Sequence, residues 1–281
     1  MAGGGGHSRV RQLNRNPALG KAKCKGVVAV NKNKALNTIT SESGNQSKRV
    51  SAFLLGAAFV LCFAAASPMT AQIAVADQPT VFLGSAATFV VLGGETVTNT
   101  GPSVITGDLG VWPGTAYVPG TPPATVIGSI HAGDIVAQHA QASLTIAYNN
   151  AAGRKLGVVG VAGDLGGRTL TPGLYKSTST MAITGDLTLD ATGHPNSIFI
   201  FQVASKLTVG TGSRVVLTGG AKASNVFWQV GSSATLGTFS AFKGTIMAHS
   251  SISIATSATL HGRALAQHGS VTLDSNVITK N

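Results

Sequence analysis

Four short segments in the second half of the chain begin and end on a hydroxyl-bearing residue. They occupy residues 208–211 (TVGT), 235–238 (TLGT), 253–256 (SIAT) and 272–275 (TLDS), and Thr188 opens a weaker fifth copy. Threonine presents one methyl and one hydroxyl group in a stiff rotamer. Ranks of such side chains can order water in a lattice-like pattern, because methyl groups cage water while hydroxyl groups anchor it. The segments therefore indicate adsorption to a surface, without bond breaking.

Alternation within these segments predicts which side chains face outward. If each segment is a strand, Val209, Leu236, Ile254 and Leu273 point inward and the hydroxyl residues point outward. The small residues between the hydroxyls would keep the outer surface flat. However, threonine is also a favourable strand residue, and outward ladders of it stabilise sheets by themselves. The residues alone leave a purely structural role open. The candidate binding residues are Thr188, Thr208, Thr211, Thr235, Gly237, Thr238, Ser253, Ala255, Thr256, Thr272 and Ser275.

Catalytic chemistry has few candidate residues. Polysaccharide-active solenoid enzymes need carboxylates that converge in a groove, but residues 77–281 hold only eight acidic residues. Asp108, Asp164 and Asp186 occur in repeated Gly-Asp-Leu segments, where a role in turns is a sufficient explanation. His249 and His268 occupy equivalent repeat positions, but two imidazoles alone make a poor metal site. The sequence therefore predicts no enzyme, no metal and no cofactor.

The elements that would position the hydroxyl residues form a repeat. Thr235, Ser253 and Thr272 are separated by 18 and 19 residues, and short runs rich in Val, Ile, Thr and Leu alternate with Gly, Ser and Asn. This pattern is typical of many short strands. A period of this length fits three strands and their corners, which is one coil of a triangular β-solenoid. Coils of this kind must stack, about 4.7–4.9 Å apart, to bury their apolar faces.

One segment departs from the strand pattern. Residues 130–154 contain no Pro, and Ala140, Leu144, Ala147 and Ala151 recur at helical spacing. The spacing predicts one amphipathic helix over about residues 133–152. We expect this helix to pack against an otherwise all-β body.

The basic charge of the chain is concentrated in its first residues. Residues 1–49 hold ten Lys or Arg, and an apolar run follows at 50–66. With the small residues that end at Ala76, this order is typical of a secretory signal peptide, cleaved after Ala76 or alternatively after Ala71. A retained membrane anchor is the other interpretation. Residues 77–281 carry ten basic and eight acidic residues, which predicts no nucleic-acid partner. We expect a secreted protein with a single domain over 77–281.

Distinctive motifs run through nearly all of residues 83–279. They include LGSAATF at 83–89, ITGDLG at 105–110, AYNNAAG at 147–153, LTPGLY at 170–175 and NVFWQV at 225–230. Through these motifs the chain resembles the large microbial ice-binding family of discontinuous β-solenoids. The resemblance implies a right-handed solenoid of triangular section with one helix along its axis. It also implies that the order of the coils in space need not follow the sequence, so that an N-terminal coil could interrupt the column of threonines.

The resemblance further implies a function. Members of the family that bind ice use one flat face rich in Thr, Ala and Ser, so the expected partner of the candidate residues is an ice crystal surface, bound by a monomer. Two departures bear on this expectation, since Phe239 follows Thr238 where relatives often have Asn, and Asp274 places a charge among the outward residues. The alternative is a non-catalytic extracellular adhesive or structural module. A polysaccharide-active enzyme is the third interpretation.

Overall fold

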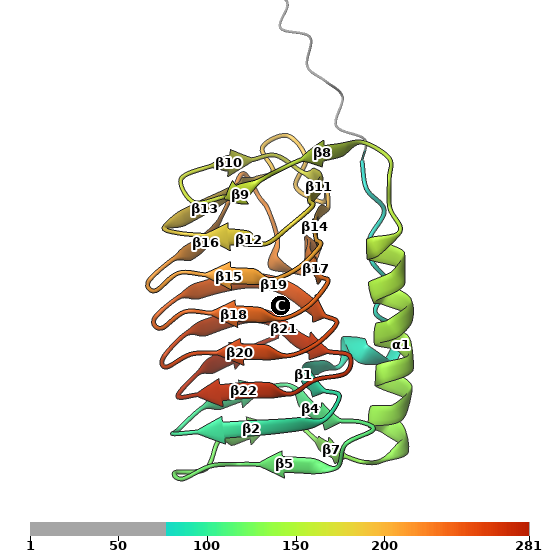
Figure 1. Cartoon of the computed structure of the whole chain (residues 1–281), viewed down its shortest axis with the longest axis vertical. Helices are drawn as coiled ribbons and strands as arrows, with labels where there is room; N and C mark the ends of the chain where they lie inside the picture. The colour runs from blue at the N-terminus through green and yellow to red at the C-terminus, as the bar shows by residue number, and fades with distance from the viewer. Residues whose placement is uncertain (1–76, 281) are drawn as a thin grey trace, which may run out of the picture. The chain divides into compact units, whose positions relative to one another are not determined.

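The computed structural model describes residues 77–280, which form stacked coils of short parallel strands with one helix beside them (Figure 1). The predicted basic leader (1–49), signal region (50–76) and cleavage site lie outside the described residues. The strands belong to a 15-stranded and an 8-stranded sheet, and within each sheet all neighbouring strands are parallel. Of two short 3-10 helices, η1 (Gly84–Ala87) precedes β1 and η2 (Ala223–Asn225) lies between β16 and β17. The predicted β-solenoid is confirmed.

The 8-stranded sheet forms one complete face of the solenoid. Its inner side is apolar, since Val209, Leu236, Ile254 and Leu273 are all buried as the alternation predicted. In spatial order its strands are β5 (Ala116–Val118), β2 (Thr96–Thr100), β22 (Val271–Asp274), β20 (Ile252–Ile254), β18 (Ala234–Leu236), β15 (Leu207–Val209), β12 (Met181–Ile183) and β9 (Gly163–Asp164).

The 15-stranded sheet forms the other two faces. Its two longest strands, β19 (Ala241–Ala248) and β21 (Thr259–Ala266), run through both faces. They bend at Gly244 and Gly262, whose φ angles of 106° and 155° suit glycine. One face, beside the helix, adds β8 (Val158–Gly160), β11 (Gly173–Ser177), β14 (Phe199–Val203), β17 (Val226–Val230), β1 (Phe89–Gly93), β4 (Asp108–Val111) and β7 (Ile130–Ala132). The third face adds β10 (Thr169–Leu170), β13 (Asp186–Asp190), β16 (Arg214–Thr218), β23 (Val277–Thr279), β3 (Val104–Thr106) and β6 (Thr125–Ile127).

The order of coils in space does not follow the sequence. The first coil of the domain pairs with the last one, because β1, β2 and β3 lie beside β21, β22 and β23. The chain then returns along helix α1 (Ile135–Ala152) to the far end, where β8 begins the second stack of coils (Figure 1). The discontinuity implied by the resemblance is therefore present. The first coil extends the second stack at its end and does not interrupt it.

Helix α1 begins and packs as the sequence predicted, within two residues. Asp134 caps its N-terminus by accepting a 2.9 Å hydrogen bond from the backbone N–H of Ala137. Ala140, Leu144 and Ala147 are buried against the adjacent sheet face. The outward side chains of that face that pack in the helix cluster are large and apolar, and they include Leu174, Ile200, Phe227, Met247 and Leu265. This face, which we call the helix-covered face, is closed to solvent along the helix.

Candidate functional site

The outward residues of the 8-stranded sheet form a continuous column of hydroxyl groups. Residues Thr208, Thr235, Ser253 and Thr272 lie in register on neighbouring strands, and Thr98 continues the column on β2. Neighbouring strands lie about 4.8 Å apart, so the column repeats its hydroxyl groups at that spacing over five strands. The side chains of the first four are exposed and that of Thr98 is half-buried. The predicted alignment of these four residues is confirmed.

A second column lies at the end of the same strands. Backbone hydrogen bonds set its register, because the residue after each member donates to the carbonyl of the next member. Examples are Gly212 N–H to Thr238 O at 2.9 Å and Phe239 N–H to Thr256 O at 3.1 Å. The members in order are Thr211, Thr238, Thr256, Asp274 and Thr100. We call the outward residues of both columns the hydroxyl face. It also includes the hydroxyl residues at the start of the same strands, which are Thr96, Ser270, Ser251 and Ser233.

The prediction that Ser275 belongs to this second column is wrong. The N–H of Ser257 donates to Asp274 O at 3.0 Å, and the N–H of Ser275 donates to Thr100 O at 2.8 Å, so Asp274 is the member aligned with Thr256. Ser275 has a φ of 53° and lies at the corner, in line with Ser257. The three preceding coils contain one more residue between their members of the two columns, and the sequence alignment carried this longer spacing into a shorter segment.

The small residue within the longer segments has a steric reason. A Cβ atom at Gly237 would lie 2.7 Å from the carbonyl oxygen of Val209 and 2.8 Å from the nitrogen of Thr211. The extra residue therefore presses against the backbone of the adjacent coil. Ala255 occupies the equivalent position one coil further along, where its carbonyl accepts a 2.8 Å hydrogen bond from Asn276 Nδ2.

Thr188 is not part of either column. Its strand β13 pairs with β10 and β16 of the other sheet, and Thr188 aligns there with Thr169 and Val216. It points outward from the third face, around a corner of the solenoid. The position that Thr188 was expected to fill is occupied by Ala182 on β12, which aligns with Thr208. The similarity of Thr188-Leu-Asp to Thr272-Leu-Asp reflects strand alternation on two different faces.

Sequence analysis missed a ladder of hydroxyls at the start of the same strands. Thr96 Oγ1 donates to Ser270 Oγ at 2.8 Å. The N–H of Ser270 donates to Ser251 Oγ at 3.3 Å, and that of Ser251 to Ser233 Oγ at 3.4 Å. With Thr98 and Thr100, Thr96 contributes a Thr-x-Thr-x-Thr strand. That alternation is visible in the sequence, but its place beside β22 follows only from the discontinuous order of the coils.

Few charges interrupt the hydroxyl face. Asp274 lies within the second column, where its carboxylate accepts hydrogen bonds from Thr256 Oγ1 and, at 3.1 Å, from Ser275 Oγ. The first column ends at Ala182 and Asp164 on one side and at Val118 on the other. The exposed ring of Phe239 stands at the corner beside Thr238, with a φ of 57°.

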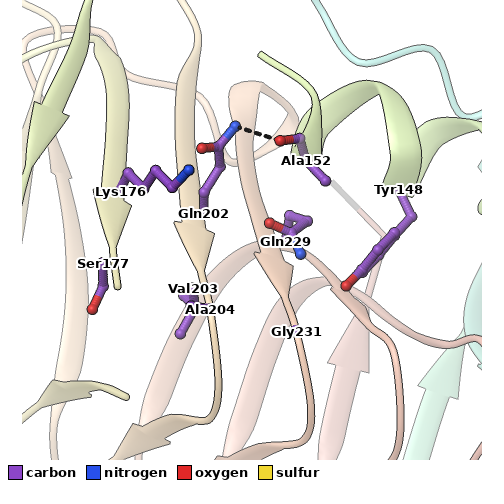
Figure 2. A pocket seen from close by; sticks show the side chains of 9 residues that line it. All are labelled: Tyr148, Ala152, Lys176, Ser177, Gln202, Val203, Ala204, Gln229 and Gly231. Atoms are coloured by element: carbon purple, nitrogen blue, oxygen red, sulfur yellow. Dashed lines mark hydrogen bonds between the residues drawn. The ribbon is translucent and has the colours of Figure 1, made fainter. Parts of the chain in front are cut away.

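One pocket lies where the end of helix α1 joins the sheet. It has a volume of about 300 Å³ and lies between α1 and the adjacent strands, lined by Tyr148, Lys176, Gln202 and Gln229 among others (Figure 2). The amide of Gln202 donates to the carbonyls of Ala151 and Ala152, at 2.8 and 3.2 Å, and so satisfies the end of the helix. No carboxylate lines this pocket, which therefore lacks a general acid or base of the kind that glycoside hydrolysis needs.

Metal ligation and membrane spanning find no support in residues 77–280. The rings of His249 and His268 do lie edge to face on adjacent coils, with centroids 4.7 Å apart. Within the described part of the chain, however, His, Cys, Asp and Glu side chains form no group of three or more that could hold a metal ion. Over the same residues, no helix is long and apolar enough to cross a membrane.

Comparisons with known proteins agree with this arrangement. A family model described as ice-binding-like matches residues 91–279. An ice-binding protein of Nostoc sp. (strain HG1) is 50% identical over 200 residues, which cover 70% of this chain and 73% of that relative. An ice-binding protein of Flavobacterium frigoris (strain PS1) is 39% identical over 216 residues, covering 71% and 76%.

Solved structures show the same similarity. The crystal structure of an ice binding protein from an Antarctic Biological Consortium is 51% identical in sequence and superposes with a TM-score of 0.70, covering 72% of this chain and 92% of that one. The ice-binding protein of the Antarctic ascomycete Antarctomyces psychrotrophicus is 39% identical, with a TM-score of 0.69 and coverage of 72% and 98%.

Proposed function

The chain belongs to the ice-binding-like family, and from this premise we propose that it adsorbs to ice crystals through the hydroxyl face. The observation that carries the proposal is the column from Thr208 to Thr98, in which five strands present a hydroxyl at one position in register. In the described residues, no other element covers this column. The helix-covered face of the same coils, by contrast, carries large apolar side chains beneath α1.

Rigidity supports adsorption by this face. The threonines are β-branched and lie on strands whose backbone N–H and C=O groups are paired on both sides, so little side-chain or backbone entropy remains to be lost on contact. The face holds its methyl and hydroxyl groups in fixed positions, where water ordered around them can join the ice lattice. A bound molecule then pins the growing ice front, and the curvature between pinned points lowers the local freezing point.

This function requires neither turnover nor a cofactor. We infer that the protein acts outside the cell, following export directed by the N-terminal basic and apolar segments, and that it acts without catalysis. The carboxylates support the second inference, since Asp164 and Asp186 are engaged in local contacts. Asp164 Oδ1 accepts hydrogen bonds from the N–H groups of Gly166 and Thr184, both at 2.9 Å. Asp186 pairs with Arg214.

The test is a bulky substitution in the middle of the column. Thr235→Tyr should lower adsorption through the hydroxyl face, and with it thermal hysteresis, by about tenfold or more, because a loss of about 1.4 kcal/mol of contact energy is already a tenfold change in affinity. The exposed Thr235 side chain makes no hydrogen bond that the fold requires, so circular dichroism and thermal melting should stay unchanged.

The matched control is Thr188→Tyr, the same substitution on the third face, which should keep full activity. Equal activity of wild-type protein and Thr235→Tyr would show that another face binds ice. A folded wild-type protein that neither adsorbs to ice nor inhibits recrystallisation would refute the proposal, and would favour an extracellular adhesive module that uses the same face on another surface.

A further inference from the structure

The third face of the solenoid is divided into two halves of different character. In its upper half, on β13 and β16, the outward side chains include an ion pair in which Arg214 Nη2 and Nε donate to the two carboxylate oxygens of Asp186 at 2.6 and 2.9 Å. In its lower half, the outward residues that β21, β23, β3 and β6 place on this face include no Asp, Glu, Lys or Arg. Lys243 on the neighbouring strand β19 aligns with His261 and marks the border of this surface.

Two columns of mostly β-branched residues cover this lower half. The first consists of Thr259, Val277, Val104 and Thr125, which lie in register on four neighbouring strands. Their inward neighbours Leu260, Ile278 and Ile105 are buried in the core, so the column members point outward. Exposure is substantial at Val277, which is 45% accessible.

The second column runs parallel to the first, two residues along each strand. It consists of His261, Thr279, Thr106 and Ile127, of which Ile127 is 58% exposed. Burial and the nearby Lys243 lower the pKa of His261 below its usual range, so its ring is neutral at pH 7. The ring nitrogen Nδ1 lies 3.0 Å from Thr279 Oγ1, which fixes its orientation. We call the two columns together the lower facet.

The lower facet and the hydroxyl face share an edge. Three residues separate Thr100 from Val104, and two separate Asp274 from Val277. The edge is held by the fully buried Asn276, whose Nδ2 donates to the carbonyls of Ala255 and Ala258 at 2.8 and 3.1 Å. Its Oδ1 accepts from the N–H of Asp274 at 2.7 Å. Because the backbone on both sides is fixed to one side chain, the two surfaces meet at a constant angle.

The side chains of the lower facet resemble those of the hydroxyl face and differ from those that this solenoid places under another protein element. Where α1 covers the sheet, the outward residues include Phe227, Met247 and Leu265. Aromatic residues and Met are enriched where proteins contact proteins. The lower facet has none of them, and six of its eight residues are Thr or Val. Its composition therefore fits contact with ordered water better than contact with a protein partner.

We propose that the lower facet is a second ice-binding surface, which adsorbs to a different ice plane from that bound by the hydroxyl face. The inference rests on the proposed function, since it assumes that ordered Thr and Val columns on this scaffold bind ice. It assigns a role to the first two coils of the domain, because β3 and β6 supply half of the facet. It also fits the position of the Asp186–Arg214 ion pair on the upper half of the third face.

The experiment is ice-plane labelling with fluorescent protein on a single-crystal ice hemisphere. Wild-type protein should label two sets of planes. Thr106→Tyr should remove one set and keep the other, Thr235→Tyr should do the opposite, and Thr188→Tyr, in the charged half of the third face, should keep both. Thr125→Tyr, at an exposed position on the edge strand β6, provides a second variant if Thr106→Tyr melts at a lower temperature than wild type.

Three results would overturn the inference. A single set of labelled planes that Thr235→Tyr abolishes and that both lower-facet variants leave intact would limit binding to the hydroxyl face. If analytical ultracentrifugation finds a dimer for the wild-type protein and a monomer for Thr106→Tyr, a second copy of the chain covers the facet. Absence of any labelling by folded wild-type protein would refute the proposed function itself, which keeps the two failures distinguishable.

Discussion

The helix-covered face and the hydroxyl face are built from the same coils, yet they present opposite surfaces. On both faces the strands are parallel, in register and buried on their inner side. They differ in their outward residues, which are Ile200 and Phe227 on one face and Thr208 and Thr235 on the other. The same arrangement of strands thus supports both an intramolecular contact with helix α1 and an open, hydroxyl-rich surface. The outward residue alone decides which of these a face becomes.

The largest effect, on stability, should come from removing a large buried side chain beneath helix α1. Phe227→Ala removes a side chain that is 2% exposed within the helix cluster. We expect a loss of about 3–5 kcal/mol in the free energy of unfolding, as for other buried aromatic residues, measured by urea denaturation. Ice adsorption per folded molecule should not change. The control Phe82→Ala alters an exposed ring and should change stability by less than about 0.5 kcal/mol. Lost adsorption in folded Phe227→Ala would show that the two faces are not independent.

A second variant should improve the hydroxyl face without touching the helix-covered one. Asp274→Thr replaces the charge in the second column by the hydroxyl that the neighbouring coils carry. Transferring a carboxylate out of liquid water costs more than transferring a hydroxyl, so ice adsorption should rise by about threefold, or roughly 0.7 kcal/mol. The readout is thermal hysteresis at equal protein concentration. Asp274→Asn separates loss of charge from gain of a hydroxyl, and a weaker Asp274→Thr protein would indicate that the carboxylate helps to order water.

The corner beside the hydroxyl face offers a smaller gain, in stability. Phe239 has a φ of 57°, and the equivalent residue of the preceding coil is Gly212, with a φ of 67°. A left-handed conformation costs a residue other than glycine about 1–2 kcal/mol, while glycine loses more entropy on folding. Phe239→Gly should therefore stabilise the protein by about 0.5 kcal/mol in thermal melting and retain ice adsorption. Reduced adsorption would show that the ring of Phe239 is part of the binding surface.

The smallest effect concerns the helix N-terminus and its dependence on pH. The backbone hydrogen bond from Ala137, then the contact with His131, lower the pKa of Asp134, and burial opposes them weakly. A lowered pKa gives stability that is fully present above the unfolded value of about 3.9 and is lost as the pH falls through the folded value. Asp134→Asn retains a capping side chain but does not titrate. Its melting temperature should fall less than that of wild type on acidification below about pH 4, and equal slopes would contradict the assignment.

Local patterns predicted the fold and half of the candidate surface. Helical spacing located α1 to within two residues, and the period between Thr235, Ser253 and Thr272 placed these residues in register. The helical signal is local to one segment. The threonine signal is repeated within one stack of consecutive coils, where each coil lies on the next one in sequence. Repetition of this kind is sufficient to set the register without knowledge of distant contacts.

The rest of the hydroxyl face could not be predicted from the sequence, because it depends on distant contacts and on single-residue differences between coils. Thr96, Thr98 and Thr100 join the hydroxyl face only because α1 separates the two stacks and returns the chain to the far end. Ser275 was misplaced because the segment from Thr272 to the second column is one residue shorter than the equivalent segment of the coil before it. Thr188 was misplaced because strand alternation looks alike on all three faces, and a short motif does not specify which face it occupies.

The pairing of the first coil with the last one has a consequence for how the molecule folds. Thr96 and Ser270, which share a hydrogen bond, are 174 residues apart in the sequence. Closing a loop of that length has a high entropic cost, and contacts with such separation slow folding. During synthesis the N-terminal coil is made first, yet its partner strands are made last. We therefore expect the junction between β2 and β22 to form late, so that refolding should restore the spectroscopic signal of the strands before it restores adsorption to ice.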